Sequence, residues 1–261
     1  MLEVRSLRKE FGDFVAVDDV TFSLPEQGSL AIVGESGSGK TTTARMIAGL
    51  ETPSGGTVAV AGAERGPGRP RPRARRARGR RIQMVFQDPY SSLDRHQRVG
   101  DAVAEAVALH QDLPAAGRRA RVAELLDLVG LDERQARSLP KALSGGQRQR
   151  VAIARALAAQ PRVLILDEAI AALDVSIQAQ ILALLARIRA DTGTALLFIT
   201  HDLGAVRHIS DDVLVMRAGR VVEHGPVGSV LDAPEDPYTR RLIDSIPKPG
   251  WKPRRRGEKA A

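Results

Sequence analysis

One octapeptide limits the possible folds of this 261-residue sequence more than any other segment. Residues 34–41 fit the phosphate-binding pattern G-x-x-x-x-G-K-[ST], with an apolar strand pattern before them at Leu30–Val33 and a helical pattern after them at Thr41–Leu50. In this context backbone N–H groups and the helix N-terminus surround a phosphate chain. We call residues 34–41 the phosphate loop. The residues expected to bind nucleotide are Gly34, Glu35, Ser36, Gly37, Ser38, Gly39, Lys40, Thr41 and Thr42.

Two carboxylates complete the chemistry that this loop needs. We expect Lys40 to meet the β- and γ-phosphates of a nucleotide and the Thr41 hydroxyl to bind Mg²⁺. The apolar strand pattern Val163–Leu166 ends in Asp167 and Glu168, which alone would also fit a buried strand with a solvated acidic end. Beside a phosphate loop, Asp167 is suited to bind Mg²⁺ and Glu168 to orient and deprotonate water.

The order of predicted elements indicates an α/β fold. Strand patterns at Leu30–Val33, Val163–Leu166 and Ala195–Thr200 are apolar throughout and alternate with helical patterns such as Val175–Ala190. Such strands are typical of a parallel sheet that is covered on both faces. Further strands are predicted at Leu2–Leu7, Val15–Leu24 and Thr57–Val60, a helical lobe at Asp101–Val129, and a loosely packed tail after Leu231.

The composition excludes some classes of site and locates the charge. Cysteine is absent, so disulfides and thiolate metal sites are excluded, and the apolar runs fall short of the roughly 20 residues that span a bilayer. Residues 65–81 hold nine arginines and no acid, and without them the net charge of +8 becomes −1. An extended, solvated loop is the simplest interpretation of this arginine-rich loop; contact with anionic lipid or nucleic acid is the alternative.

A second glycine-rich turn points to a family. Residues 143–147 (Leu-Ser-Gly-Gly-Gln) precede the helical pattern Arg148–Ala159, so that the Ser and Gly N–H groups would form another anion site. This pentapeptide, just before an apolar strand that ends in Asp-Glu, resembles the signature of the ABC ATPase family. The resemblance implies a P-loop NTPase (RecA-like) core with an ABC-specific antiparallel β subdomain and an inserted α-helical subdomain. It also implies that Ser144, Gly145, Gly146 and Gln147 of one subunit close over the phosphate loop of another.

Five further residues match the family in order. Gln87 resembles the Q-loop glutamine, which touches Mg²⁺ and couples the site to the membrane partner, and His201 resembles the switch histidine, which contacts the γ-phosphate. Phe11 matches the aromatic residue that stacks on adenine, and the resemblance places Val17 in the nucleotide site as well. Asp174 matches the D-loop aspartate. If each residue were considered alone, simpler interpretations would hold: Gln87 would be a solvated residue near a turn, His201 a surface residue and Phe11 part of the core.

Several segments resemble one branch of the family, the dipeptide, oligopeptide and nickel importers. They are Gly34–Gly39, Val85–Leu93, Asp174–Leu182, Asp236–Leu242 and Ser245–Pro247. The resemblance implies an ABC ATPase domain over residues 1–240, with a helical signature lobe at about 88–155, and a C-terminal extension over 232–261.

The function implied by this branch is that of an ATP-binding and hydrolysing subunit that energises an importer of di- or oligopeptides. An importer of nickel or another small solute is the alternative. A soluble ABC ATPase acting on nucleic acid or ribosomes would usually show duplicated cassettes, a coiled-coil insertion or zinc-binding cysteines, which this sequence lacks.

The cofactors and partners follow from the same resemblance. ATP and Mg²⁺ are the expected cofactors. Two integral membrane permeases, a second ABC ATPase that is identical or paralogous, and an extracytoplasmic solute-binding protein are the expected partners, with no specific nucleic acid. The expected location is the cytoplasmic face of the cell membrane, as a peripheral protein.

Overall fold

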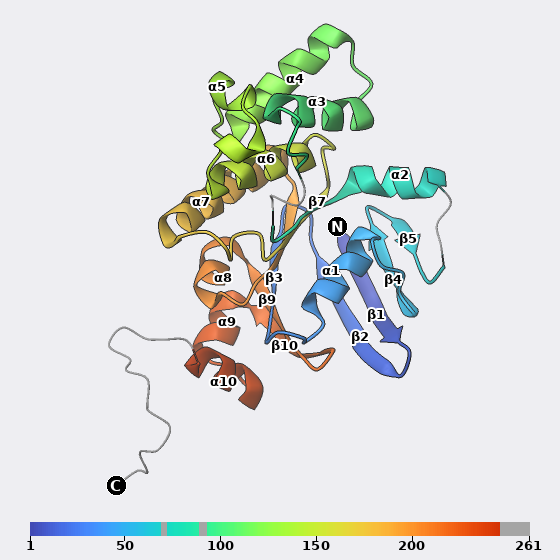
Figure 1. Ribbon diagram of the computed structural model, residues 1–261. Helices are drawn as coiled ribbons and strands as arrows, with labels where there is room; N and C mark the ends of the chain where they lie inside the picture. Colours follow the sequence, from blue (N-terminus) through green and yellow to red (C-terminus); the bar gives the residue numbers. More distant parts are fainter. Residues whose placement is uncertain (69–71, 89–92, 246–261) are drawn as a thin grey trace.

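Two β-sheets and a group of helices make up the protein in this computed structural model, which describes residues 1–68, 72–88 and 93–245 (Figure 1). Parts of the arginine-rich loop (69–71), of the segment 85–93 (89–92) and of the C-terminal extension (246–261) therefore lie outside the described residues.

The central sheet has six strands in the order β10-β9-β3-β8-β7-β6. All neighbouring pairs are parallel except β10 and β9. The strands are β3 (Ser29–Val33), β6 (Ile82–Val85), β7 (Val163–Asp167), β8 (Ala195–Ile199), β9 (Asp212–Arg217) and β10 (Arg220–Pro226). Every residue of β3, β7 and β8 is buried, which confirms the parallel sheet predicted from their apolar sequences.

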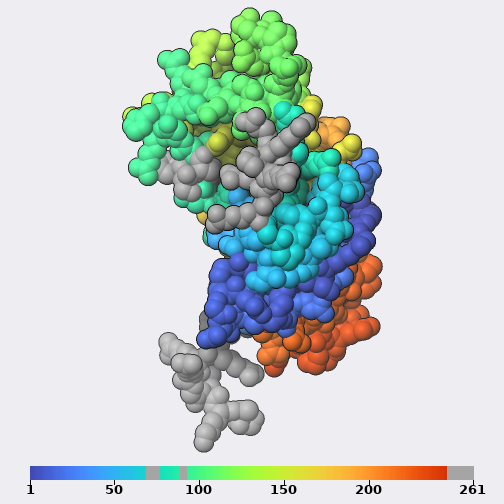
Figure 2. Space-filling model, turned by 90° about the vertical axis from the view of Figure 1, so that its right-hand side faces the viewer, coloured from blue at the N-terminus to red at the C-terminus, as the bar shows by residue number. Residues whose placement is uncertain are grey.

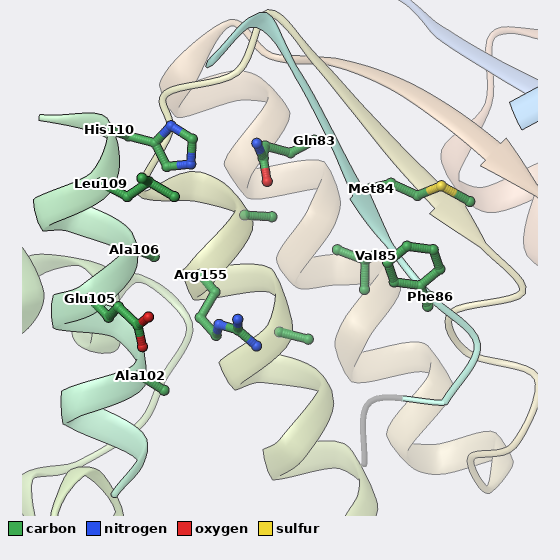
Figure 3. Close-up of a pocket in the computed structure, with 12 residues that line it drawn as sticks. Gln83, Met84, Val85, Phe86, Ala102, Glu105, Ala106, Leu109, His110 and Arg155 are labelled. Atoms are coloured by element: carbon green, nitrogen blue, oxygen red, sulfur yellow. The ribbon is translucent and has the colours of Figure 1, made fainter. Parts of the chain in front are cut away.

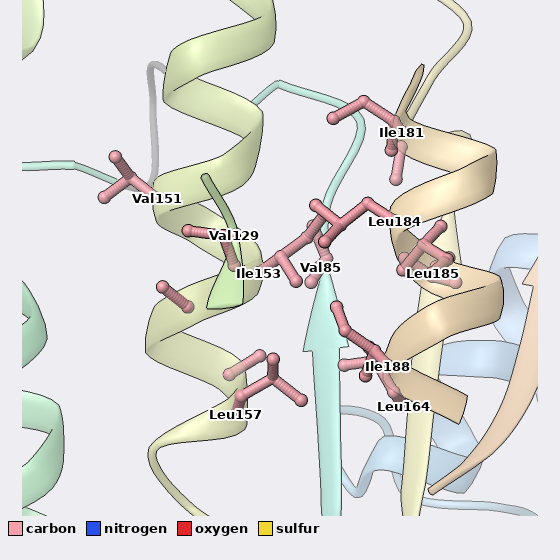
Figure 4. Close-up of a cluster of buried hydrophobic side chains, with 14 of the residues drawn as sticks. Val85, Val129, Val151, Ile153, Leu157, Leu164, Ile181, Leu184, Leu185 and Ile188 are labelled. Atoms are coloured by element: carbon pink, nitrogen blue, oxygen red, sulfur yellow. The ribbon is translucent and has the colours of Figure 1, made fainter. Parts of the chain in front are cut away.

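Helices and a second sheet cover the central sheet on opposite faces. Ile165 and Leu197 pack with α1 (Lys40–Ala48) and the N-terminal strands, whereas Leu164 and Phe198 pack with α6 (Gly145–Leu157) and α7 (Val175–Thr192). Figure 4 shows the second cluster, in which side chains from α6 and α7 meet over β6 and β7. Neighbouring residues of a strand thus enter different cores, as the pleat requires.

The N-terminal sheet is antiparallel, with the order β2-β1-β4-β5. Its strands are β1 (Leu2–Phe11), β2 (Phe14–Leu24), β4 (Gly55–Val60) and β5 (Ala63–Arg65). Leu2, Val4 and Leu7 of β1 are buried while most of its other residues are not, so one face of this sheet meets the core and the other meets solvent.

The helical lobe lies apart from the N-terminal sheet, on the far side of the central sheet (Figures 1 and 2). It contains α3 (Val99–His110), α4 (Ala115–Leu128), α5 (Glu133–Ala136), the 3₁₀-helix η1 (Pro140–Ala142) and α6. Its interior uses Val103, Val107, Leu125 and Ile153, all fully buried. The helical pattern predicted for this region is confirmed.

Two predictions about local structure are wrong. The arginine-rich segment forms α2 (Pro72–Arg81) instead of a loop, because arginine and alanine are strong helix formers and proline is tolerated at a first helical position. The described part of the region after Leu231 is packed: α10 (Pro237–Asp244) contacts β10, next to α8 (Leu203–Ile209) and α9 (Val227–Asp232), which cover the sheet beside β9 and β10. Asp236 caps α10, whose Tyr238 and Thr239 are buried.

Within the described ranges, none of the helices has the length and apolar character needed to cross a membrane.

Candidate active site

The phosphate loop joins β3 to α1 at the carboxyl end of β3. Gly34 has φ +147°, and a side chain there would collide with the carbonyl oxygen of Met216. Gly39 has φ +99°, and a Cβ atom would lie 2.5 Å from the carbonyl oxygen of Ala16. Both positions therefore need glycine, because the loop is pressed against β9 on one side and β2 on the other.

Lys40 holds the loop in shape from within. Its Nζ donates to the carbonyl oxygens of Gly34 and Glu35, both at 2.8 Å, and the residue is only 5% exposed. Burial lowers the pKa of Lys40, although the carboxylates of Glu168, Asp167 and Glu35 act in the opposite direction. The ammonium group is thus poorly solvated and gains from a nearby anion.

The outer side of the loop is open to a ligand. Ser36 and Gly37 are exposed, and Thr41 and Thr42 are half-buried. Ser38 is buried, and its hydroxyl has no hydrogen-bond partner among the described residues. A phosphate chain lying along the loop would therefore meet exposed backbone and polar side chains.

Thr41 and Asp167 bring two oxygen donors together. The Thr41 hydroxyl donates to Oδ1 of Asp167 at 3.1 Å, across the boundary between α1 and β7. Burial raises the pKa of Asp167, while the hydrogen bond from Thr41 acts to lower it. Hydroxyl and carboxylate oxygens are the donors that Mg²⁺ prefers, so this pair fits the predicted metal ligands.

Gln87 emerges at the same edge of the sheet. It is exposed and follows β6 by two residues, and Val85 of β6 pairs in parallel with Leu166, next to Asp167. No hydrogen bond joins Gln87 to Thr41 or Asp167 in the described structure. The strand order therefore places Gln87 at the same edge as the Thr41–Asp167 pair. No contact among the described residues shows Gln87 as a metal ligand.

Glu168 and His201 face each other across neighbouring strand ends. Oε1 of Glu168 lies 3.6 Å from Nδ1 of His201, and the Glu168 N–H donates to the carbonyl oxygen of Ile199 at 2.9 Å. Glu168 has φ +47°, an unfavourable left-handed conformation for a residue with a side chain. Such strain is typical of functional sites, where neighbouring contacts hold a side chain in place.

Phe11 and Val17 differ in their surroundings. Phe11, at the end of β1, is 49% exposed, and the Lys9 ammonium lies 4.7 Å from its ring centroid. Its ring is therefore available for stacking. Val17 is fully buried and packs behind Gly39, so that it supports the loop from the core side.

The signature residues form the start of α6. The Ser144 hydroxyl accepts from the Gln147 N–H, and the Gln147 side chain accepts from the Ser144 N–H, which makes a capping box. A Cβ atom on Gly146 would lie 2.5 Å from Cγ2 of Ile177, and one on Gly145 would lie 3.3 Å from Leu173. The glycines therefore allow α6 and α7 to approach closely.

Asp174 begins α7 as its N-cap. Its Oδ1 accepts from the Ser176 hydroxyl at 2.7 Å and from the Ile177 N–H at 2.9 Å. These hydrogen bonds lower the pKa of Asp174. Neither an ion pair nor a hydrogen bond joins Ser144, Gln147 or Asp174 to the phosphate loop within the described part of this chain.

A pocket of about 440 Å³ lies beside the segment that carries Gln87 (Figure 3). β6, α3 and α6 form its walls, with Met84, Phe86, Glu105 and Leu109 among the lining side chains. Phe86 is 37% exposed and Leu109 55%. No sequence motif predicted this pocket, although the apolar series Ala102, Ala106 and Leu109 on one side of α3 is a signal for it.

Tyr238 contacts the phosphate loop, although no sequence motif predicted it as a site residue. Its hydroxyl accepts a hydrogen bond at 3.0 Å from the backbone N–H of Glu35, in the phosphate loop. The motif Asp236–Leu242 drew attention to this segment, but only as a mark of the C-terminal extension.

Known proteins are similar to this chain in sequence and fold. The family described as ABC transporter matches residues 17–171. The Di/tripeptide transport ATP-binding protein DppF of Pseudomonas aeruginosa is 43% identical over 93% of this chain and 75% of its own length. The Glutathione import ATP-binding protein GsiA of Escherichia coli is 46% identical over 89% of this chain, which corresponds to 37% of GsiA. A dimeric ATP-binding cassette, solved in a post-hydrolysis state with ADP and Pi, has a TM-score of 0.77 and 28% identity, over 87% of this chain and 99% of its own.

Proposed function

The chain belongs to the ABC transporter family, whose ATP-binding subunits hydrolyse ATP, and we propose that its hydrolysis energises the import of di- or oligopeptides. The observation that carries the chemistry is the meeting of four segments at one edge of the central sheet: the phosphate loop, Gln87, Asp167–Glu168 and His201. The names of DppF and GsiA, a di/tripeptide and a glutathione transport protein, support a peptide as the cargo.

ATP binds, in this proposal, with its phosphates along the loop of residues 34–41 and its adenine on Phe11. Lys40 neutralises the β- and γ-phosphates, for which its low solvation favours an anionic partner. The Thr41 hydroxyl, the Asp167 carboxylate and Gln87 would hold Mg²⁺, which would supply positive charge beside the phosphates.

Hydrolysis requires a base beside the γ-phosphate. The Glu168 carboxylate is close enough to interact electrostatically with Asp167 and Lys40, and in this proposal it takes a proton from the attacking water. His201, at 3.6 Å from Glu168, contacts the γ-phosphate in this proposal and senses its loss.

A second ATPase subunit completes each site. Ser144, Gly145, Gly146 and Gln147 lie at the N-terminus of α6, with N–H groups suited to an anion, yet they make no hydrogen bond to the phosphate loop of their own chain among the described residues. We infer that they close over the loop of a partner, identical or paralogous, with Asp174 at the contact between the subunits. The dimeric state of the related cassette with ADP and Pi supports this arrangement.

Two integral membrane permeases are the proposed transport partners, at the cytoplasmic face of the cell membrane. The pocket beside Phe86 is suited to receive a segment of a permease, because it combines exposed apolar side chains with a position one residue from Gln87. An extracytoplasmic solute-binding protein would deliver the peptide. We assign residues 1–240 to the ATPase domain and 232–261 to a C-terminal extension that overlaps its end.

Purification of the tagged full-length chain from membranes of its host tests this proposal. We expect two integral membrane proteins to co-purify. Reconstituted in proteoliposomes, the complex should take up a labelled dipeptide only when ATP is supplied on the side of this chain, and the Glu168→Gln complex serves as the matched control. ATP-driven uptake of nickel without uptake of the peptide would show that nickel, and not a peptide, is the cargo. If no membrane protein co-purifies, the transport role is overturned.

A further inference from the structure

The hydrogen bond between Tyr238 and the phosphate loop links the last described helix to the nucleotide site. The Tyr238 hydroxyl lies 3.0 Å from the Glu35 nitrogen, although 203 positions separate the two residues. Tyr238 is only 4% exposed, so its ring has little freedom to move away. α10 lies at the end of the molecule where β3 passes into α1 (Figure 1).

Tyr238 is fixed from both ends. At its backbone, Asp236 accepts from the N–H of Tyr238 at 2.7 Å, and the Glu223 carboxylate in turn accepts from the N–H groups of Glu235 and Asp236 at 2.9 and 3.2 Å. At its ring, the Arg217 guanidinium lies 5.0 Å from the centroid, which suits a cation–π contact. The hydroxyl is thus presented to Glu35 in one orientation.

β9 and the turn after it support the phosphate loop at two further points. The Met216 carbonyl closes against Gly34, and the Gly219 N–H donates to the Ser38 carbonyl at 3.1 Å. Tyr238 acts through its side-chain hydroxyl, whereas the Met216 carbonyl and the Gly219 N–H are backbone groups of β9 and the turn after it. Its hydroxyl can therefore be removed without disturbing the other supports.

We propose that Tyr238 is a positioning residue for the phosphate loop, which makes α10 part of the nucleotide site. By holding the Glu35 peptide, it keeps the first turn of the loop in the conformation that presents N–H groups to phosphate. Nucleotide binding then requires less ordering of the loop. This inference rests on the proposed role of the loop in binding ATP, and it predicts an effect on affinity, because Tyr238 makes no described contact with Asp167, Glu168 or His201.

Tyr238→Phe is the direct test, because it keeps the ring and removes only the hydroxyl. A neutral hydrogen bond of this kind corresponds to a loss of affinity of about three- to tenfold. We expect equilibrium binding of a fluorescent ATP analogue to the full chain to weaken by this factor and KM for ATP to rise in parallel, with kcat within about twofold of wild type. Ser245→Ala is the matched control, since its hydroxyl is also on this segment and, among the described residues, donates to the Leu242 carbonyl and not to the phosphate loop.

Hydrogen exchange gives a readout that overall stability would not mimic. In the nucleotide-free protein, peptides that cover residues 34–39 should exchange faster in Tyr238→Phe than in wild type, while peptides of β7 and β8 should not change. Glu223→Gln, which weakens the hold on the start of α10, should give a smaller change of the same sign and keeps the inference testable if the first variant folds poorly.

The outcomes separate this inference from the function on which it rests. Wild-type protein that fails to bind the ATP analogue would overturn the proposed function. Wild-type protein that binds, with Tyr238→Phe equal to it in affinity and in exchange of the loop, would overturn the role of Tyr238 alone. A loss of kcat without a change in affinity would also overturn it.

Discussion

The Thr41 hydroxyl donates to the Asp167 carboxylate at 3.1 Å, so the two proposed metal ligands lie together. Thr41 is the second residue of α1 and Asp167 is the last residue of β7. Each of these elements has a fully buried face. The contact therefore depends on the packing of rigid elements, and little rearrangement should be needed to form the metal site.

Asp167→Asn should stabilise the nucleotide-free protein while it abolishes ATP hydrolysis. Burial raises the pKa of Asp167 above its unfolded value, so folding favours the protonated form and the carboxylate destabilises the fold once the pH exceeds the unfolded pKa. Urea unfolding at pH 7 should show the gain, and the gain should shrink as the pH falls through the folded pKa and vanish below the unfolded pKa. A less stable variant at pH 7 would contradict the prediction.

Glu168→Gln should bind ATP and fail to turn it over. Loss of the base is expected to lower the hydrolysis rate by about 10²- to 10⁴-fold, since glutamine cannot accept the proton from water. ATP binding and phosphate release, measured on the same preparation, provide the two readouts. Glu64→Gln, at an exposed position of β5 outside the site, is the control for loss of a negative charge; retained turnover in Glu168→Gln would remove Glu168 as the base.

Gly146→Ala should destabilise the protein more than Gly145→Ala. The new methyl group at position 146 would lie 2.5 Å from Ile177, and at position 145 it would lie 3.3 Å from Leu173. Overpacking of this kind costs about 1–3 kcal/mol, and the milder contact should cost less. Thermal unfolding tests the order, and adding Ile177→Ala to Gly146→Ala should recover part of the loss; equal melting temperatures for the two single variants would contradict it.

The Lys9–Glu51 pair should stabilise the fold in a pH-dependent way. The 2.6 Å hydrogen bond from Lys9 lowers the pKa of Glu51 below its unfolded value. The contribution is therefore present above the unfolded pKa and lost as the pH falls through the folded pKa. Glu51→Gln should lose about 1 kcal/mol or less at pH 7 and nothing at pH 2, whereas Glu133→Gln, in an exposed pair, should change little at either pH. A loss that persists at pH 2 would refute the pairing.

The sequence predicted three strands of the central sheet, β3, β7 and β8, because a strand buried on both faces must be apolar at nearly every position; it did not predict β6, β9 or β10. The apolar segments Leu30–Val33 and Val163–Leu166 fit few structures other than a buried strand. The phosphate loop between Val33 and α1 was recognised from the local pattern of its glycines. Motif order then identified the side chains that meet at the carboxyl edge, such as Asp167, since parallel strands bring their ends together.

The sequence did not predict contacts between distant segments or the helical state of α2. Arginine is a good helix former as well as a solvent-exposed residue. The charge of residues 65–81 indicated exposure to solvent but not the helix. The contact between Tyr238 and Glu35 depends on the packing of α10 against the sheet, which no local pattern encodes. The burial of Val17 likewise depends on which face of β2 meets Gly39.

The left-handed backbone at Glu168 has a consequence for laboratory evolution. A residue with a side chain is strained at φ +47°, whereas glycine adopts that conformation readily. Glu168→Gly should therefore raise the melting temperature while it removes the proposed base. A library of variants screened only for heat resistance would enrich inactive proteins at this position, so that such a screen must be paired with a measurement of ATP turnover.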